Sequence, residues 1–346
     1  MNNKKPFIFI IDDEGKVTKE FEDSHGNDYR IESMDFSKYP DSASFLHSLR
    51  KRLENELSSD NKPDLILTDL KHEIKDESLK DLKSNIKKIM KEDLPKAIEK
   101  YNSLARPVLE KHGINVLRLV RKLYSEYIPV AIYSGTSFIA EYENKELMEE
   151  HLSLKGHWIQ MNLGKIYESM KIKQILRDGC ANQFILIIDG KGKQSEDFIK
   201  NHDGEYRIEV IKNANIASIE EILRNDYSSS NQPDIILTDF MSIKEGTEPQ
   251  LVAQIYEEAK KLKGVINDLN AISPPAYGKH GVHVLEIIRD VYQDNTPVAI
   301  YTGFGIITEY LNSEDHIAIV RLNGHWFQKR LSKSYEEKMI KHLLER

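Results

Sequence analysis

The fold of this chain is decided by an apolar stretch that ends in an acid and occurs twice. The first copy reads Pro63-Asp64-Leu65-Ile66-Leu67-Thr68-Asp69-Leu70, and the second reads Pro233-Asp234-Ile235-Ile236-Leu237-Thr238-Asp239-Phe240. A short run rich in branched apolar residues is typical of a buried strand in a parallel sheet. Asp69 and Asp239 would then emerge at the carboxyl end of their strands, the edge at which open α/β sheets bind ligands.

Other segments are also present twice and in the same order. The run 7–12 matches 184–189, the run 129–135 matches 297–303, and Gly-His-Trp occurs at 156–158 and again at 324–326. Repeated segments in a fixed order indicate a tandem duplication. We therefore expect one domain over residues 1–179 and a second over residues 183–346.

Within each repeat, strand patterns alternate with helix patterns. In the first repeat we expect strands near 7–12, 29–35, 64–69, 130–135 and 157–161, and helices near 42–58, 115–126, 137–152 and 165–177. Such alternation predicts a parallel sheet covered by helices on both faces. The expected fold class is α/β, with two tandem flavodoxin-like, doubly wound domains of five parallel strands each.

Each repeat carries a helical insert after its third strand, at about 71–111 in the first and about 241–279 in the second. Apolar residues recur there every three or four positions, which predicts amphipathic helices. Leu94-Pro95 should break the first insert, and the second should begin a helix at 247–250. Two interpretations stay open: the inserts lengthen the domain core, or they form a homodimer or partner interface.

Composition excludes several classes of protein. The chain has 346 residues, 40% of them hydrophobic and 30% charged, and no apolar run long enough to span a bilayer. Its one cysteine, Cys180, permits no intrachain disulfide and suits a reducing cytoplasm. A net charge of −7 disfavours nucleic acid as a partner. We expect a cytoplasmic protein with neither membrane nor nucleic acid as its partner.

Three acids are predicted to lie close together. Asp12 and Asp13 end the first strand, and in a doubly wound sheet that end lies beside Asp69 at the end of the third strand. Two like charges about 4 Å apart repel by about 4 kcal/mol at an effective dielectric near 20. The cluster therefore needs a proton or a cation, and oxygen ligands favour Mg²⁺. The alternative is that one acid is solvated and the others cap helices.

Each repeat resembles the receiver domain of two-component response regulators along most of its length, apart from the insert. The acid pair of that family is matched by Asp12 and Asp13, its phosphoacceptor by Asp69, and its Ser/Thr by Ser134. The resemblance implies Mg²⁺-dependent transfer of a phosphoryl group from a kinase histidine to Asp69. It also implies that the Ser/Thr and a lysine would contact the new phosphate.

Neither repeat matches the family completely. The lysine position of the first repeat holds Met161, unless Lys155 or Lys165 reaches the site. The second repeat matches with Asp189, Asp239, Thr302 and Lys329, but Gly190 stands where its second acid should be. The resemblance therefore implies a first repeat that accepts phosphate and a second that is a pseudo-receiver.

We expect a signalling protein whose partners are proteins, such as a sensor histidine kinase, rather than an enzyme. A scaffold in which both repeats have lost phosphorylation is the main alternative. A phosphatase using Asp12 and Asp69 is a third, although it has no evident general base. We interpret His157 and His325 as packed structural residues, His112 and His280 as helix-start residues, and Cys180 as incidental.

Overall fold

The structure is a computed structural model. It describes residues 5–12, 16–55, 57, 61–68, 72–73, 78, 80–105, 109–110, 112–124, 128–134, 145–160, 163–176, 183–189, 193–212, 215–227, 231–238, 242–243, 247–272, 277–278, 280–293, 296–302, 313–328 and 332–345. No helix in these ranges is long and apolar enough to cross a membrane.

The first repeat contains the elements β1 to α8. They are β1 (Phe7–Asp12), α1 (Lys16–His25), β2 (Arg30–Asp35), η1 (Phe36–Lys38), α2 (Ser42–Asn55), β3 (Leu65–Thr68), β4 (His72–Glu73), α3 (Lys80–Lys88), η4 (Ile89–Asp93), α4 (Leu94–Ala105), β5 (Leu109–Glu110), α5 (His112–Tyr124), β6 (Val130–Ser134), α7 (Lys145–Ser153), β7 (His157–Gln160) and α8 (Lys165–Leu176). The five predicted strands are confirmed, whereas α1 was not predicted.

The second repeat contains the elements β8 to α15. They are β8 (Phe184–Asp189), α9 (Lys193–His202), β9 (Arg207–Lys212), α10 (Ile216–Asp226), β10 (Ile235–Thr238), β11 (Ser242–Ile243), α11 (Pro249–Ile272), β12 (Tyr277–Gly278), α12 (His280–Tyr292), β13 (Val298–Thr302), α14 (Ser313–Arg321), β14 (Gly324–Gln328) and α15 (Lys333–Leu344).

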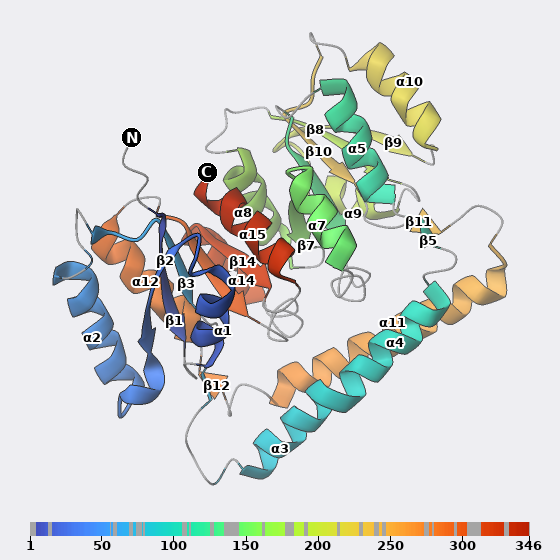
Figure 1. The fold of residues 1–346 in the computed structure, drawn as a ribbon. Coiled ribbons are helices and arrows are strands. Elements are labelled where there is room, and N and C mark those ends of the chain that lie inside the picture. Colours follow the sequence, from blue (N-terminus) through green and yellow to red (C-terminus); the bar gives the residue numbers. More distant parts are fainter. Residues whose placement is uncertain are drawn as a thin grey trace. The chain divides into compact units, whose positions relative to one another are not determined.

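The α/β class and the two five-stranded parallel sheets are confirmed (Figure 1). One sheet has the order β14-β13-β3-β1-β2, and the other has the order β7-β6-β10-β8-β9. If the strands of each sheet are numbered by their place in a repeat, both orders are those of a flavodoxin-like, doubly wound sheet.

The two repeats exchange their last two strands. β3 of the first repeat pairs with β13 of the second, and β10 of the second repeat pairs with β6 of the first. Unit 1 accordingly consists of Met1–Lys88 and Asp268–Arg346, and unit 2 of Ile89–Asn267. The expected domains 1–179 and 183–346 are therefore wrong. Sequence similarity locates the repeats, but the fourth strands of the two copies are so similar that each could pair with the third strand of either copy.

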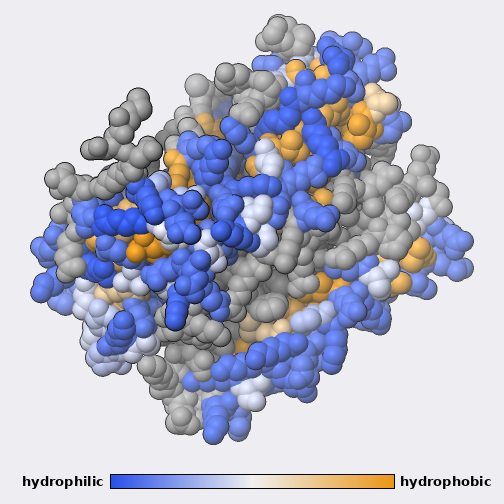
Figure 2. Space-filling model, in the orientation of Figure 1, coloured by the Kyte–Doolittle hydropathy of each residue, from blue (hydrophilic) through white to orange (hydrophobic). Residues whose placement is uncertain are grey.

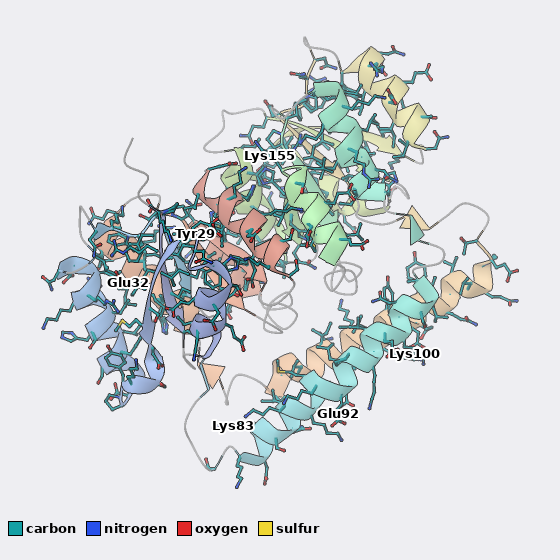
Figure 3. The ribbon with its side chains drawn as sticks, viewed as in Figure 1. Tyr29, Glu32, Lys83, Glu92, Lys100 and Lys155 are labelled. Carbon is teal, nitrogen blue, oxygen red and sulfur yellow. The ribbon has the colours of Figure 1, made fainter. Side chains whose placement is uncertain are left out.

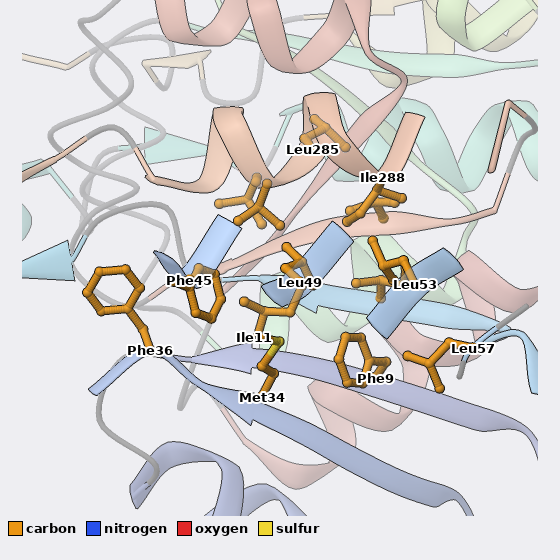
Figure 4. Packing of buried hydrophobic residues seen from close by; sticks show 14 of the residues in the cluster. Phe9, Ile11, Met34, Phe36, Phe45, Leu49, Leu53, Leu57, Leu285 and Ile288 are labelled. Carbon is orange, nitrogen blue, oxygen red and sulfur yellow. The ribbon is translucent and has the colours of Figure 1, made fainter. Parts of the chain in front are cut away.

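The core of unit 1 is built from both ends of the chain. Side chains of α2, among them Phe45, Leu49 and Leu53, pack between the sheet and the Leu285 and Ile288 side chains of α12 (Figure 4). All five of these side chains are fully buried. Burying one such side chain contributes roughly 1.5–3 kcal/mol, so the exchanged segments contribute directly to the stability of the unit.

The core of unit 2 repeats this arrangement with the roles of the repeats reversed. Ile219 and Leu223 of α10 pack with Leu117 and Val120 of α5 in one buried cluster. The sheet contributes Leu186 and Ile236, among others, to the same cluster.

Asp64 and Asp234 hold the first and third strands of each sheet together. An Asp64 Oδ2 atom accepts a hydrogen bond from the Phe7 backbone N–H at 2.7 Å, and Asp234 does the same for Phe184 at 2.7 Å. Asp64 and Asp234 thus have a structural role and lie at the amino ends of the strands, whereas Asp69 follows the carboxyl end of β3 in the sequence.

Arg121 and Arg289 also have structural roles. Arg121 lies on α5, one residue after the buried Val120. Its guanidinium donates to the carbonyls of Ile128, Leu154 and Lys155 at 2.8, 2.7 and 3.1 Å. Arg289 does the same for Thr296, Leu322 and Asn323. Lys155 and Asn323 both have φ near 50°, so each arginine fixes a left-handed turn that leads into the last strand.

The inserts are helical, as expected, but Leu94-Pro95 does not break the first one. Residues 80–105 are helical throughout, and the π-helical turn η4 directly precedes Leu94 and Pro95. Proline lacks the N–H that a continuous α-helix uses, so an irregular turn is expected at this place. α4 lies beside α11, and Lys100 Nζ is 3.1 Å from Glu258 Oε1 (Figures 1 and 3). α11 begins at Pro249, as predicted.

Most apolar residues of the insert stripes are buried within the chain. Ile86, Ile98 and Tyr101 are buried in the first insert, as are Leu262 and Ile266 in the second. Short strands join the inserts, since β5 pairs with β11 and β4 with β12. Where residues are described, the face in Figure 2 is mainly hydrophilic with small hydrophobic areas. The burial of these stripes within the chain leaves less apolar surface for a partner, which favours internal packing of the inserts over the interface interpretation.

Arg121→Ala should lower the free energy of unfolding by about 2–4 kcal/mol, because three carbonyls lose a charged donor. Arg118→Ala in the same helix is the matched control. Arg118 is half exposed and pairs with Glu150, so its loss should cost less than about 1 kcal/mol. Urea unfolding monitored by circular dichroism measures both. Equal losses for the two variants would contradict the structural role of Arg121.

His151 should make the fold sensitive to acid. Its Nε2 lies 3.1 Å from the carbonyl of His157, and burial lowers its pKa from 6.5 to about 4. The unfolded chain therefore binds more protons between those pH values, and stability falls as pH drops from 6.5 towards 4, by up to about 3 kcal/mol. His151→Leu should flatten this part of the stability curve, and His47→Leu, at an exposed position, should not. Parallel curves for wild type and His151→Leu would refute the assignment.

Candidate functional site

The carboxyl ends of four strands from both repeats meet at one edge of unit 1. Ile11 is in register with Thr68, Thr68 with Ile300, and Thr302 with Gln328. All these strands are parallel, so β1, β3, β13 and β14 end on the same side of the sheet. The sequence that follows each strand therefore starts from this edge.

Asp12 is the candidate site residue whose side chain the structure describes in unit 1. It ends β1 and is 3% exposed. Asp13, Asp69 and Lys329 lie outside the described residues, as does the side chain of Thr302, although its backbone ends β13. The described backbone thus fixes the strand ends, and the sequence supplies the residues that follow them.

The strand exchange changes how the candidate residues are grouped. We expected Asp69 to share its site with Ser134 and position 161 of the same repeat. That grouping is wrong, because β3 pairs with β13 and not with β6. Asp69 follows a strand that lies beside the one ending in Thr302, and β14, which precedes Lys329, comes next. The first three strands of one repeat and the last two of the other therefore share an edge.

The corresponding edge of unit 2 collects the remaining candidates. β8 ends at Asp189 and β6 ends at Ser134, while Asp239 follows β10 and Met161 follows β7 in the sequence. Gly190, Met161 and Asp239 lie outside the described residues, as does the Ser134 side chain. Asp189 is 2% exposed, and its Oδ2 accepts a hydrogen bond from the Ser195 backbone N–H at 2.9 Å. This acid is thus engaged at the start of α9.

Neither proposed substitute for the missing lysine is placed at this edge. Lys155 precedes β7, at the opposite end of that strand from its carboxyl edge. Lys165 is the first residue of α8, and its Nζ lies 2.8 Å from Glu205 Oε1, so its charge is already paired. Lys165 also lowers the pKa of Glu205, followed in effect by His202.

Within the described ranges, no group of three or more His, Cys, Asp or Glu residues could hold a metal ion. The acids expected to bind Mg²⁺ are only partly inside those ranges, since Asp13 and Asp69 are not described. The carboxylate oxygens of Asp12, Asp13 and Asp69 are the donor type that Mg²⁺ prefers, so the residues present fit this ion.

A buried tyrosine–glutamate–histidine triad lies below each edge. In unit 1, Tyr301 OH donates to Glu336 Oε1 at 2.7 Å, and His25 Nε2 lies 2.8 Å from Glu336 Oε2. In unit 2, Tyr133 OH donates to Glu168 Oε1 at 2.7 Å, and His202 Nε2 lies 2.9 Å from Glu168 Oε2. Each triad joins the first helix of one repeat to the last helix of the other.

The triads lie directly next to the candidate Ser/Thr positions. Tyr133 precedes Ser134 and Tyr301 precedes Thr302, and neighbouring residues of a strand point to opposite faces. Burial, followed by the Glu168 carboxylate, raises the pKa of Tyr133 far above its ordinary value. Tyr133 therefore stays protonated and donates.

Sequence reasoning missed these triads, although a signal was present. A histidine ends the first helix of both repeats, and a tyrosine precedes the Ser/Thr in both. The histidines that we did single out have other positions. His112 is the buried first residue of α5, His325 is buried in β14, and His157 accepts a hydrogen bond from His151 through its carbonyl. The side chain of His280 and all of Cys180 lie outside the described residues.

A search of protein-family models finds no match for this chain. A search of curated proteins also finds none that matches.

Glu336→Gln should lower the free energy of unfolding by about 1–3 kcal/mol, because an amide cannot accept from Tyr301 and His25 as a carboxylate does. Glu337→Gln, at the neighbouring exposed position, is the control and should change stability by less than about 0.5 kcal/mol. Thermal unfolding at neutral pH compares them. Similar midpoints for the two variants would argue against a stabilising triad.

Proposed function

We propose that this chain is a cytoplasmic signalling protein of the response-regulator type, in which Asp69 accepts a phosphoryl group. The observation that supports this best is the strand order of unit 1. It brings the end of β1, the strand that precedes Asp69, and the strands that precede or contain Thr302 and Lys329 to one edge. Asp12 and Thr302 end strands of this sheet, and Asp13, Asp69 and Lys329 follow strands of the same sheet in the sequence.

In this proposal Mg²⁺ is held by Asp12, Asp13 and Asp69. The metal would neutralise the acids and the incoming phosphoryl oxygens, which is its main contribution to phosphoryl transfer. The Asp69 carboxylate is the nucleophile. Thr302 would donate a hydrogen bond to the new phosphate, and Lys329 would form an ion pair with it.

Unit 2 is a pseudo-receiver in the same proposal. Its edge has Asp189, Asp239 and Ser134, but Gly190 and Met161 replace the second acid and the lysine. The second acid and the lysine, each missing from one repeat, are thus both missing from unit 2, and unit 1 has a candidate residue for every position of the proposed site.

The partners would be proteins: a sensor histidine kinase as the phosphoryl donor, and a signalling protein that recognises the changed surface. A homodimer through the helical inserts remains part of the proposal, although the burial of their apolar stripes weakens it. The main alternative is a scaffold in which neither unit is phosphorylated.

Acetyl phosphate with Mg²⁺ should add one phosphoryl group to the full chain, on Asp69 and not on Asp239. Intact-protein mass spectrometry and peptide mapping identify the site. Asp69→Asn should remove the adduct, and Asp239→Asn should leave it. A wild-type chain that stays unmodified with both acetyl phosphate and beryllofluoride would favour the scaffold.

The contribution of Lys329 can be separated from acceptance of phosphate. In a Trp158→Phe background, Trp326 on β14 is the single tryptophan and reports on the strand that leads to Lys329. Lys329→Ala should keep the adduct but reduce the fluorescence change on phosphorylation several-fold. Lys333→Ala is the control. Met161→Lys should have no effect on this signal, because position 161 follows a strand of unit 2.

A further inference from the structure

An ion pair joins the two exchanged segments at an equivalent place in each unit. In unit 1, Arg50 Nη1 on α2 lies 2.6 Å from Asp290 Oδ2 on α12. In unit 2, Lys122 Nζ on α5 lies 3.0 Å from Glu220 Oε1 on α10. Each pair connects an early helix of one repeat to a late helix of the other.

The four residues occupy only two positions of the repeat. Arg50 and Glu220 are equivalent, since each follows a buried residue, Leu49 or Ile219, of the same helix. Lys122 and Asp290 are also equivalent, since each stands two residues before Tyr124 or Tyr292. The charge at both positions is reversed between the repeats, so the contact between the two helices joins a cation to an anion in each unit. Arg50 also lies 3.7 Å from Glu54, and Glu220 lies 2.7 Å from Arg224, within their own helices. Both arrangements of the repeats keep these pairs within one helix.

Without strand exchange, the same contacts would join like charges. Arg50 would face Lys122 in one domain, and Glu220 would face Asp290 in the other. Like charges in contact are destabilising by about as much as opposite charges are stabilising.

The apolar contacts and the tyrosine hydrogen bonds of this surface do not distinguish the two arrangements. The buried residues are similar in both repeats, with Leu53 equivalent to Leu223 and Leu285 to Leu117. The tyrosines are also alike. Tyr292 OH donates to the Leu57 carbonyl at 2.9 Å, and Tyr124 OH donates to the carbonyls of Leu223 and Tyr227. Apolar packing and these hydrogen bonds would form in either arrangement.

We infer that the surface formed by α2 with α12, and by α10 with α5, selects its partner by charge. α2 accepts the anionic helix α12 of the other repeat and rejects the cationic position of its own α5. Each ion pair is largely exposed and weak by itself. The choice between the exchanged and the unexchanged arrangement depends on the difference in their free energies, and two attractive contacts in the first replace two repulsive contacts in the second. Weak pairs are therefore enough to favour the exchanged arrangement. This inference does not depend on phosphorylation.

A second contact reports which repeats are paired. Lys165 Nζ on α8 is 2.8 Å from Glu205 Oε1, after α9. Lys333 is the equivalent first residue of α15. A carbodiimide should therefore link Glu205 to Lys165 in the exchanged arrangement and to Lys333 in the other. Peptide mass spectrometry of the monomer fraction gives the ratio of the two links.

The decisive variant is Lys122→Asp with Asp290→Lys. It reverses both charges on the late helices, and it places opposite charges four residues after Arg118 and Glu286, so the helices themselves lose nothing. After refolding from denaturant at low salt, the ratio of the Lys165 link to the Lys333 link should fall at least tenfold from the wild-type value. At 1 M salt the fall should be smaller, because exposed charges are screened.

The quadruple variant is the control. Adding Arg50→Glu and Glu220→Arg restores opposite charges across both exchanged contacts, and the ratio should return to within about twofold of wild type. If the double variant does not fold, recovery of folding and of the wild-type ratio in the quadruple variant supports the inference. A double variant that keeps the wild-type ratio, or a quadruple variant that does not recover, overturns it.

Discussion

The parallel pairing of β3 with β13, and of β10 with β6, is the contact on which the other features of the chain depend. It is made by backbone hydrogen bonds such as Ile66 N–H to the Pro297 carbonyl at 2.9 Å and Ile236 N–H to the Pro129 carbonyl at 3.0 Å. β3 and β10 are the central strands of their sheets and are buried on both faces, so each needs a neighbour on either side. Whichever repeat supplies that neighbour also supplies the fifth strand, the last helix and two of the strand ends at the carboxyl edge of the sheet.

This pairing decides which residues of the two repeats share a sheet edge. Considered one repeat at a time, each lacks one residue of a receiver site: a lysine in the first and an acid in the second. After exchange, one edge gathers the strands that end at or precede Asp12, Asp13, Asp69, Thr302 and Lys329. At the other edge, Gly190 and Met161 stand where the second acid and the lysine would be. A duplicated protein whose copies exchange strands can lose residues from each copy and still keep one complete set.

The exchange is supported by polar contacts as well as by the core. Each Tyr–Glu–His triad joins the first helix of one repeat to the fourth strand and last helix of the other, and it is buried where an unpaired carboxylate would be costly. Because Tyr301 immediately precedes Thr302, a movement at the edge would also move a side chain anchored to Glu336. The triad is thus a physical connection between the edge of the sheet and two helices.

The sequence by itself determined the class of the fold, the strands and most helices. Local periodicity, the repeated apolar runs and the turn residues are properties of short segments, and short segments are what a sequence displays directly. It also determined which residues end the strands, including Asp12 and the position of Asp69. It did not determine which repeat lies beside which. The apolar residues of the two copies are nearly interchangeable, so the choice of partner repeat depends on weak long-range contacts. Examples are Arg50 with Asp290, which are more than 200 residues apart in the chain, and Lys122 with Glu220, which are about 100 residues apart. Only the tertiary structure decided that choice, and with it the grouping of the strands that lead to Asp69, Thr302 and Lys329, because the pairing of two copies with the same fold depends on contacts between residues far apart in the sequence.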